Sequence, residues 1–343
     1  MLLSQLVQLP LVLLQSLLRI QLSDHIVDVG YAKYTSNHRL GEYSIGYLGV
    51  PYADPPIGDN RFRAPVPLKE VKRKSKEIVD LSSYPEFCIQ GGRDGLRGGA
   101  GSEDCLKLNI YKPVNATRNS ALPVLVFFHG GGYTFGNPRN FPFDHWINQS
   151  PNILIVSVYY RVGSFGFLAP PTTESNTHDL NAGFLDQIEA LRWIQRNIRS
   201  FGGDPARVTI DGHSAGGSSV LLHLLREEEE KLFAAAIAQS VYRVPVPRVD
   251  QQRELFDFYA NEAGCHESNV SEQMECLRKA DVSALTRAQD NSETSVTFTS
   301  PYRFFRPVVD GKIIRDYPTR TLLKGQSARV PLLVGYAFTI ALV

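Results

Sequence analysis

This chain has no excess of charge of either sign, and it has few long apolar runs. The 343 residues hold 36 Lys and Arg against 35 Asp and Glu, a formal net charge of +1. Without a basic excess or a basic stripe, nothing indicates a nucleic-acid partner. The sequence also lacks internal repeats, low-complexity tracts, metal-ligand clusters and dinucleotide-binding motifs, so we expect no metal and no cofactor.

The most apolar segment is the N-terminal one. Residues 1–18 carry no charge and are rich in leucine, but Gln, Ser and Pro interrupt them. This stretch is too short and too broken to span a membrane well. We interpret residues 1–22 as a signal peptide that lacks a basic start and a visible A-x-A cleavage site, and residues 23–343 as one domain. A wrongly assigned start codon is the alternative.

Cysteine is also sparse, with four residues in the chain: Cys88, Cys105, Cys265 and Cys276. Four cysteines allow three pairings, and the sequence alone does not choose among them. Four reduced thiols in a cytosolic protein are the alternative. Three N-glycosylation sequons begin at Asn115, Asn148 and Asn269. An apolar leader, an even cysteine count and sequons together favour a secreted, extracellular protein.

The pattern from residue 123 onwards predicts alternating strands and helices. Hydrophobic residues make up 43% of the chain, enough for one large core. Strands are predicted at 124–128, 152–160, 207–211, 234–239 and 330–335, and helices at 179–199, 218–225 and across 249–290. Such alternation is typical of an α/β fold with a largely parallel central sheet.

The most informative motif lies between a predicted strand and a predicted helix. Residues 212–216 read Gly-His-Ser-Ala-Gly, the G-x-S-x-G pattern of a nucleophile elbow. A sharp strand-to-helix turn needs small neighbours around its central residue, and Gly212 and Gly216 meet that need. The motif therefore predicts Ser214 as a nucleophile at the carboxyl end of the sheet. A structural turn rich in small residues is the alternative.

A second motif follows the apolar strand at 124–128. His129 precedes three consecutive glycines, Gly130 to Gly132. Glycines allow backbone N–H groups to approach an anion closely, and an esterase uses such a loop as part of its oxyanion hole. We therefore expect Gly131, Gly132 and Ala215 to donate to the oxyanion. A flexible glycine loop is the alternative.

Further segments carry a resemblance to a known family. They are 49–58 (GVPYADPPIG) with Arg61-Phe62, 102–109 (SEDCLKLN), 160–168 (YRVGSFGFL), 181–187 (NAGFLDQ) and 201–205 (FGGDP). Together with the two motifs above, they resemble the type-B carboxylesterases, a family that includes cholinesterases and secreted fungal lipases. By this resemblance the chain is identified as a secreted, fungal-type member with an α/β-hydrolase fold.

The resemblance implies several further features. It pairs Cys88 with Cys105 and Cys265 with Cys276, and it pairs Arg61 with Glu103 and Arg161 with Asp186 in structural ion pairs. It implies a small-molecule or lipid ester as substrate, cleaved through a serine nucleophile and an acyl-enzyme intermediate. One position departs from the family, because His213 stands where many members have Glu. The particular ester and the oligomeric state are not indicated.

The sequence does not show the acid and the histidine that a catalytic serine requires. The family places its catalytic Glu five residues after Gly335, at Ile340, and a histidine further on, but residues 337–343 contain neither. We therefore expect a fold that lacks its C-terminal strands and helices and a chain that is inactive as written. The alternatives are a non-catalytic binding or adhesion protein on an esterase fold, and a nonfunctional truncated product.

Overall fold

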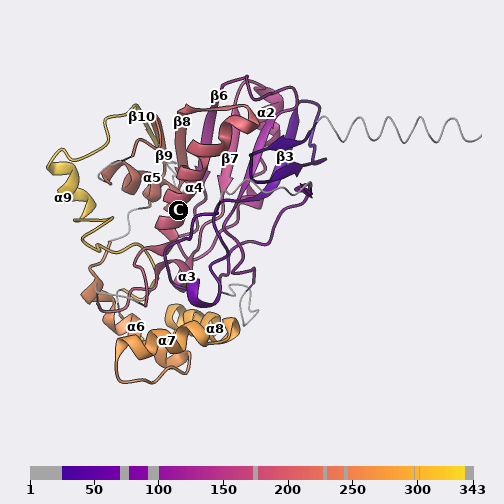
Figure 1. Ribbon diagram of the computed structural model, residues 1–343. Coiled ribbons are helices and arrows are strands. Elements are labelled where there is room, and N and C mark those ends of the chain that lie inside the picture. The colour runs from indigo at the N-terminus through magenta and orange to yellow at the C-terminus, as the bar shows by residue number, and fades with distance from the viewer. Residues whose placement is uncertain are drawn as a thin grey trace, which may run out of the picture.

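A seven-stranded sheet forms the centre of the computed structural model, which describes residues 25–69, 77–91, 100–172, 177–226, 230–242, 246–296, 298–300 and 302–336. Its strand order is β10-β9-β8-β6-β7-β5-β3. The strands are β3 (Ser44–Pro51), β5 (Lys107–Pro113), β6 (Leu122–Phe128), β7 (Leu154–Val158), β8 (Gly203–His213), β9 (Ala235–Gln239) and β10 (Leu332–Gly335). Figure 1 shows this sheet between β3 on one side and β10 on the other.

Five neighbouring strands are parallel; next to them β5 runs in the opposite direction, and β3 at the edge again runs in the same direction as the five. β7, β6, β8, β9 and β10 run in parallel, whereas β5 pairs antiparallel with both β3 and β7. Parallel strands need crossover connections, and these are built here by helices. β6 and β7 are almost entirely buried, as expected for apolar strands covered on both faces. The predicted α/β fold with a largely parallel sheet is confirmed.

The two faces of the sheet pack against different helices. Val126 and Phe128 of β6 belong to the large core with α4 (Ala182–Asn197) and α5 (Ala215–Leu225), whereas Phe127 packs with Ile147 of α2 (Asp144–Gln149). Side chains alternate along a strand, so neighbouring residues of β6 serve opposite faces. The sheet is therefore a middle layer, and α5 lies directly beneath the end of β8.

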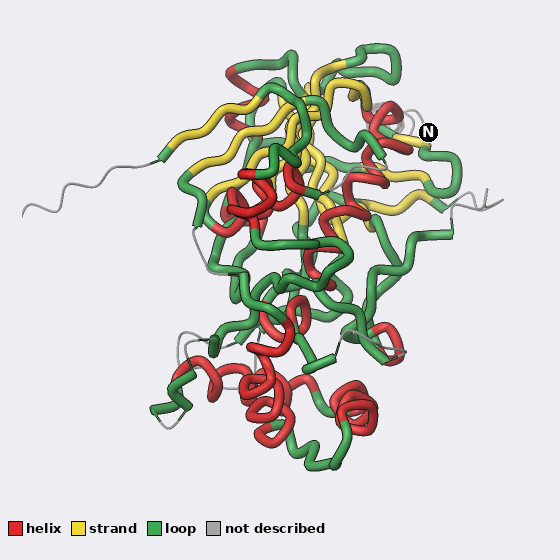
Figure 2. Tube along the Cα trace, turned by 90° about the vertical axis from the view of Figure 1, so that its left-hand side faces the viewer, coloured by secondary structure: helices red, strands yellow, loops and turns green. Residues whose placement is uncertain are grey.

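The remaining elements lie around this core. A small sheet contains β1 (Val27–Asp28), β2 (Lys33–Thr35) and β4 (Ile78–Asp80). The helices are α3 (Gly163–Phe167), α6 (Arg253–Glu262), α7 (Val270–Lys279), α8 (Val282–Thr294) and α9 (Pro318–Leu323). α6, α7 and α8 form a group away from the sheet, as both views show (Figure 1 and Figure 2). No helix in the described ranges is long and apolar enough to cross a bilayer.

Two buried ion pairs fix loops to this framework. Arg61 donates to both carboxylate oxygens of Glu103, at 2.6 and 2.8 Å. Arg161 likewise donates to Asp186 at 2.8 and 2.6 Å, and both of these side chains are almost fully buried. These are the pairs that the family resemblance implies, and the second connects the segment before α3 to α4.

Candidate active site

Ser214 lies in a strained turn between β8 and α5. Its backbone angles are φ 58° and ψ −119°, a conformation that L-residues rarely adopt. Hydrogen bonds hold it on both sides: the Ser214 N–H donates to the carbonyl of Gln239 at 3.0 Å, and its own carbonyl accepts from the N–H of Ser218 at 2.9 Å. The predicted strand–turn–helix context is present, and the side chain is half-buried.

The flanking glycines permit close backbone contact. A Cβ added at Gly212 would lie 2.3 Å from the carbonyl carbon of Gly216, and one added at Gly216 would lie 2.0 Å from the carbonyl oxygen of Phe128. Real Cβ atoms do not approach backbone this closely, so the turn requires glycine at both positions. The beginning of α5 therefore packs directly against the end of β6.

The glycine loop after β6 reaches the same place. A Cβ on Gly130 would lie 3.0 Å from the Cβ of Ser214, while Gly131 and Gly132 adopt positive φ angles of 110° and 65°. Across the part of the chain that the structure describes, the N–H groups of Gly131, Gly132 and Ala215 donate no hydrogen bond. Free backbone donors beside a nucleophile are what an oxyanion hole requires.

Two aromatic residues support the glycine loop. The His129 ring stacks on Tyr160 at 4.3 Å, and the Tyr160 hydroxyl donates to the His129 carbonyl at 2.7 Å. Burial lowers the pKa of His129 to about 4, so this ring is neutral near pH 7. Tyr133 ends the loop, and its hydroxyl accepts from Ser219 of α5 at 3.3 Å. The loop is thus tied to the segment after β7 and to the elbow helix.

No histidine contacts the serine hydroxyl. All eight histidines lie within the described ranges, and no hydrogen bond joins any of them to the Ser214 Oγ there. His213 is exposed, although it is next to the serine. His223 is fully buried in α5, where its Nε2 lies 3.2 Å from Gln187 and burial holds its pKa well below the usual value. The expected position of the family's acid, Ile340, lies outside the described residues.

A buried carboxylate under the turn was not identified from the sequence. Asp211 of β8 is 2% exposed, and the Gln239 side chain donates to its two oxygens at 2.8 and 3.0 Å. Burial raises the pKa of Asp211, and the Gln239 hydrogen bonds oppose that shift. Because Gln239 also accepts from Ser214 N–H through its backbone, it links the buried acid to the turn. A polar pair aligned across two strands is a long-range feature with no local sequence signal.

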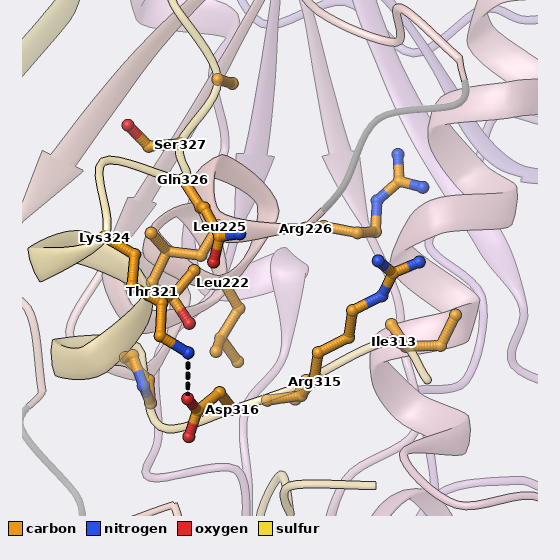
Figure 3. A pocket seen from close by; sticks show the side chains of 13 residues that line it. Leu222, Leu225, Arg226, Ile313, Arg315, Asp316, Thr321, Lys324, Gln326 and Ser327 are labelled. Carbon is orange, nitrogen blue, oxygen red and sulfur yellow. Dashed lines mark hydrogen bonds and ion pairs between the residues drawn. The ribbon is translucent and has the colours of Figure 1, made fainter. Parts of the chain in front are cut away.

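Two cavities adjoin α5. The larger, about 920 Å³, includes Tyr133, Ser218 and Tyr242 among its lining residues, and Tyr242 N–H donates to the Ser214 carbonyl at 3.2 Å. The other, about 550 Å³, lies between α5 and α9 (Figure 3). It is lined by the charged residues Arg226, Arg315, Asp316 and Lys324, of which Lys324 pairs with Asp316 at 2.9 Å. Only the larger cavity includes a residue of the glycine-loop segment.

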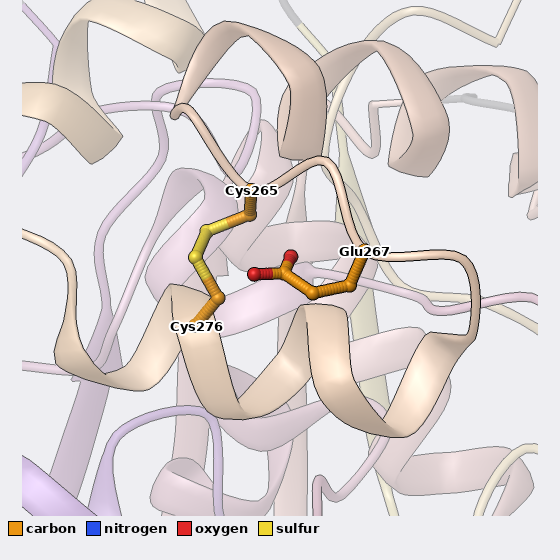
Figure 4. Close-up of side chains that lie close together, drawn as sticks. All are labelled: Cys265, Glu267 and Cys276. Carbon is orange, nitrogen blue, oxygen red and sulfur yellow. A yellow bond between two sulfur atoms is a disulfide. The ribbon is translucent and has the colours of Figure 1, made fainter.

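The cysteines form two disulfides. Cys88 is bonded to Cys105 and Cys265 to Cys276, the pairing that the family resemblance implies. Glu267 lies close to the second disulfide (Figure 4). Both sulfur atoms there are consumed by the bond, and a disulfide sulfur is no thiolate ligand, so this group does not fit a metal ion.

The three sequon asparagines differ in how they are used. Asn115 and Asn269 are exposed, and Asn269 caps α7 by accepting from the N–H of Glu272 at 2.9 Å. Asn148 is half-buried, and its Nδ2 donates to the carbonyl of Leu40 while its Oδ1 accepts from the N–H of Tyr43. A glycan on Asn148 would disturb these contacts. The predicted signal peptide lies outside the described residues.

The chain matches the model of the carboxylesterase family over residues 32–339, and it belongs to that family. It is similar to an acetylcholinesterase of Bungarus fasciatus, with 36% identity over 84% of this chain and 48% of the relative. It is also similar to a chlorogenic acid esterase of Aspergillus niger, with 34% identity over 84% of this chain and 57% of the relative.

Solved structures show the same relationship. The EstA structure of Aspergillus niger superposes with a TM-score of 0.77 and 34% identity, covering 90% of this chain and 59% of that protein. A PNB esterase structure also gives a TM-score of 0.77, at 28% identity. The α/β-hydrolase fold is thereby confirmed. The chain spans about half the length of the curated relatives it matches.

Proposed function

We propose that this chain carries the nucleophilic part of a serine ester hydrolase. Ser214 Oγ forms a bond to the ester carbonyl carbon, and the N–H groups of Gly131, Gly132 and Ala215 stabilise the oxyanion of the tetrahedral intermediate. The C–O bond to the alcohol then breaks, which leaves an acyl-enzyme that water hydrolyses. The strained backbone of Ser214, against which Gly130 packs, is the observation that carries this proposal.

The proton of Ser214 needs an acceptor. In the family pattern a histidine takes it and gives it to the leaving alcohol, and a carboxylate orients that histidine. Among the described residues no histidine bonds to the hydroxyl. We therefore propose that the chain as written hydrolyses esters slowly. The oxyanion donors alone can retain an acceleration of about 10³ over water.

Imidazole tests both parts of the proposal. We expect added imidazole to act as an external base and to increase p-nitrophenyl butyrate hydrolysis by the chain. Ser214→Ala is the matched control, because imidazole also cleaves this ester in solution and that background is common to both proteins. Equal rates with and without the serine hydroxyl would contradict the nucleophile assignment. High activity without imidazole would instead reveal a base that we have not identified.

A non-catalytic binding protein on an esterase fold is the second candidate. The lack of a histidine bonded to Ser214 within the described ranges favours it. The same experiment separates the two, because a pure binding protein would show no imidazole-dependent, Ser214-dependent turnover.

We also propose export, with glycans on Asn115 and Asn269. The two disulfides favour an oxidising compartment, and both asparagines are exposed. Treatment of protein secreted by a eukaryotic host with an N-glycosidase should lower its mass. The mass would stay unchanged if neither sequon were used.

A further inference from the structure

The large cavity beside α5 holds a buried cation that the proposed reaction does not use. The cavity extends from Tyr133 and Ser218, next to the elbow, to α9 and β10. Aliphatic side chains form a large part of its lining, including Leu221, Leu222, Val241, Val246 and Leu322. Hydroxyl-bearing residues such as Ser218, Ser240 and Thr319 also line it, and Arg306 is the one charged residue among its described lining residues.

The Arg306 guanidinium has little to compensate its burial. The residue is only 8% exposed, and its Nε is buried without a hydrogen-bond partner. Its contact is a ring, that of Phe304, whose centroid lies 5.1 Å from the Arg306 Cζ. Within the described part of the chain, Arg306 makes no hydrogen bond and no ion pair.

An unpaired buried charge is costly, so its retention calls for a partner. Glu293 acts on Arg306 through its charge but does not come within ion-pair distance, and Tyr242 is the other titratable group that influences it. Burial lowers the pKa of Arg306, yet a guanidinium remains protonated in proteins. A cation with five N–H donors therefore faces a cavity that offers it no anion.

We propose that Arg306 is an anion-recognition residue and that the cavity takes an ester whose apolar arm ends in a carboxylate. The aliphatic walls would contact the methylene groups of the arm, and the ester group would lie at the end near the elbow. The guanidinium fork matches a carboxylate in two parallel hydrogen bonds. The ester group in this inference rests on the proposed function, whereas the recognition of an anion by Arg306 does not.

The test compares two esters that differ only in this charge. Monomethyl suberate carries an ester and a carboxylate, whereas dimethyl suberate has the same chain and no charge. We would titrate both by calorimetry into the 343-residue chain with Ser214→Ala, which prevents hydrolysis during the measurement. We expect the monoester to bind about tenfold more tightly or better, the range of a hydrogen bond to a charged group.

A matched arginine controls for total charge. Arg303 contacts the same ring, with its Cζ 5.5 Å from the Phe304 centroid, but it is not among the residues that line this cavity. Arg306→Gln should abolish the preference for the monoester, Arg303→Gln should leave it intact, and Arg306→Lys should keep part of it. Thermal unfolding should show Arg306→Gln at least as stable as the parent, because the variant removes a buried unpaired charge.

Three results would overturn the inference: equal binding of the two esters, an unchanged preference in Arg306→Gln, or no binding of either ester. Its failure is distinct from failure of the proposed function. A chain that prefers the monoester yet shows no Ser214-dependent turnover with imidazole would retain the anion site and lose the esterase assignment. Ser214-dependent turnover without a preference for the monoester would retain the esterase assignment and lose the anion site.

Discussion

Replacing Ser214 by glycine should stabilise the protein while removing the proposed nucleophile. The backbone at φ 58° and ψ −119° costs a residue with a Cβ about 1–3 kcal/mol. Glycine relieves this strain. Its greater conformational freedom in the unfolded chain, however, lowers the free energy of unfolding by about 0.5–1 kcal/mol. Ser214→Ala keeps the strain and lacks the hydroxyl, so it is the proper reference. We expect Ser214→Gly to exceed Ser214→Ala by about 1 kcal/mol in free energy of unfolding.

Guanidinium denaturation at neutral pH measures this difference, and thermal unfolding should show a shift of about 1–2 °C in the same direction. Glu275 is a suitable control because it is exposed in the middle of α7. There the order should reverse, with Glu275→Gly less stable than Glu275→Ala by about 1 kcal/mol. If Ser214→Gly proves no more stable than Ser214→Ala, the turn stores no strain and the reasoning is refuted.

Two more predictions concern buried charge. Asp186→Asn should lower the free energy of unfolding by about 3–5 kcal/mol in denaturant titrations, because it leaves Arg161 buried without its counter-charge; the exposed Asp250→Asn should leave the midpoint unchanged, and equal effects would contradict this. For His129, whose pKa falls from about 6.5 unfolded to about 4 folded, stability present above pH 6.5 is lost as pH decreases towards 4. His129→Gln should flatten this slope, and identical slopes would contradict it.

The observed start of helix α4 differs from the start that the local pattern predicted. The helix expected from residue 179 begins at Ala182, because Asn181 adopts φ 57° and its side chain amide donates to the carbonyl of Val308 and to Asp310. These partners lie more than a hundred residues away in sequence. Asn is a preferred N-cap residue, so its type was a local signal for the helix start, but its side chain makes no capping hydrogen bond and bonds these distant partners instead.

The sequence by itself determined the elbow and the glycine loop. Turn chemistry is local: Gly212 is required because a Cβ there would lie 2.3 Å from the carbonyl carbon of Gly216, four positions further on. Apolar runs likewise specified the buried strands β6 and β7, since both faces of a parallel strand meet the core. These features depend on residues within a few positions of one another.

Only the tertiary structure decided what surrounds the serine. It brought Gln239 of β9 against Asp211 of β8, left the Ser214 hydroxyl without a hydrogen bond to any histidine of the described ranges, and placed Arg306 on the wall of a cavity. The cost of an unpaired charge depends on burial and on partners distant in the chain, and neither is encoded in a local pattern. The proposed nucleophile, Ser214, therefore follows from a local pattern, whereas the burial of Arg306 does not.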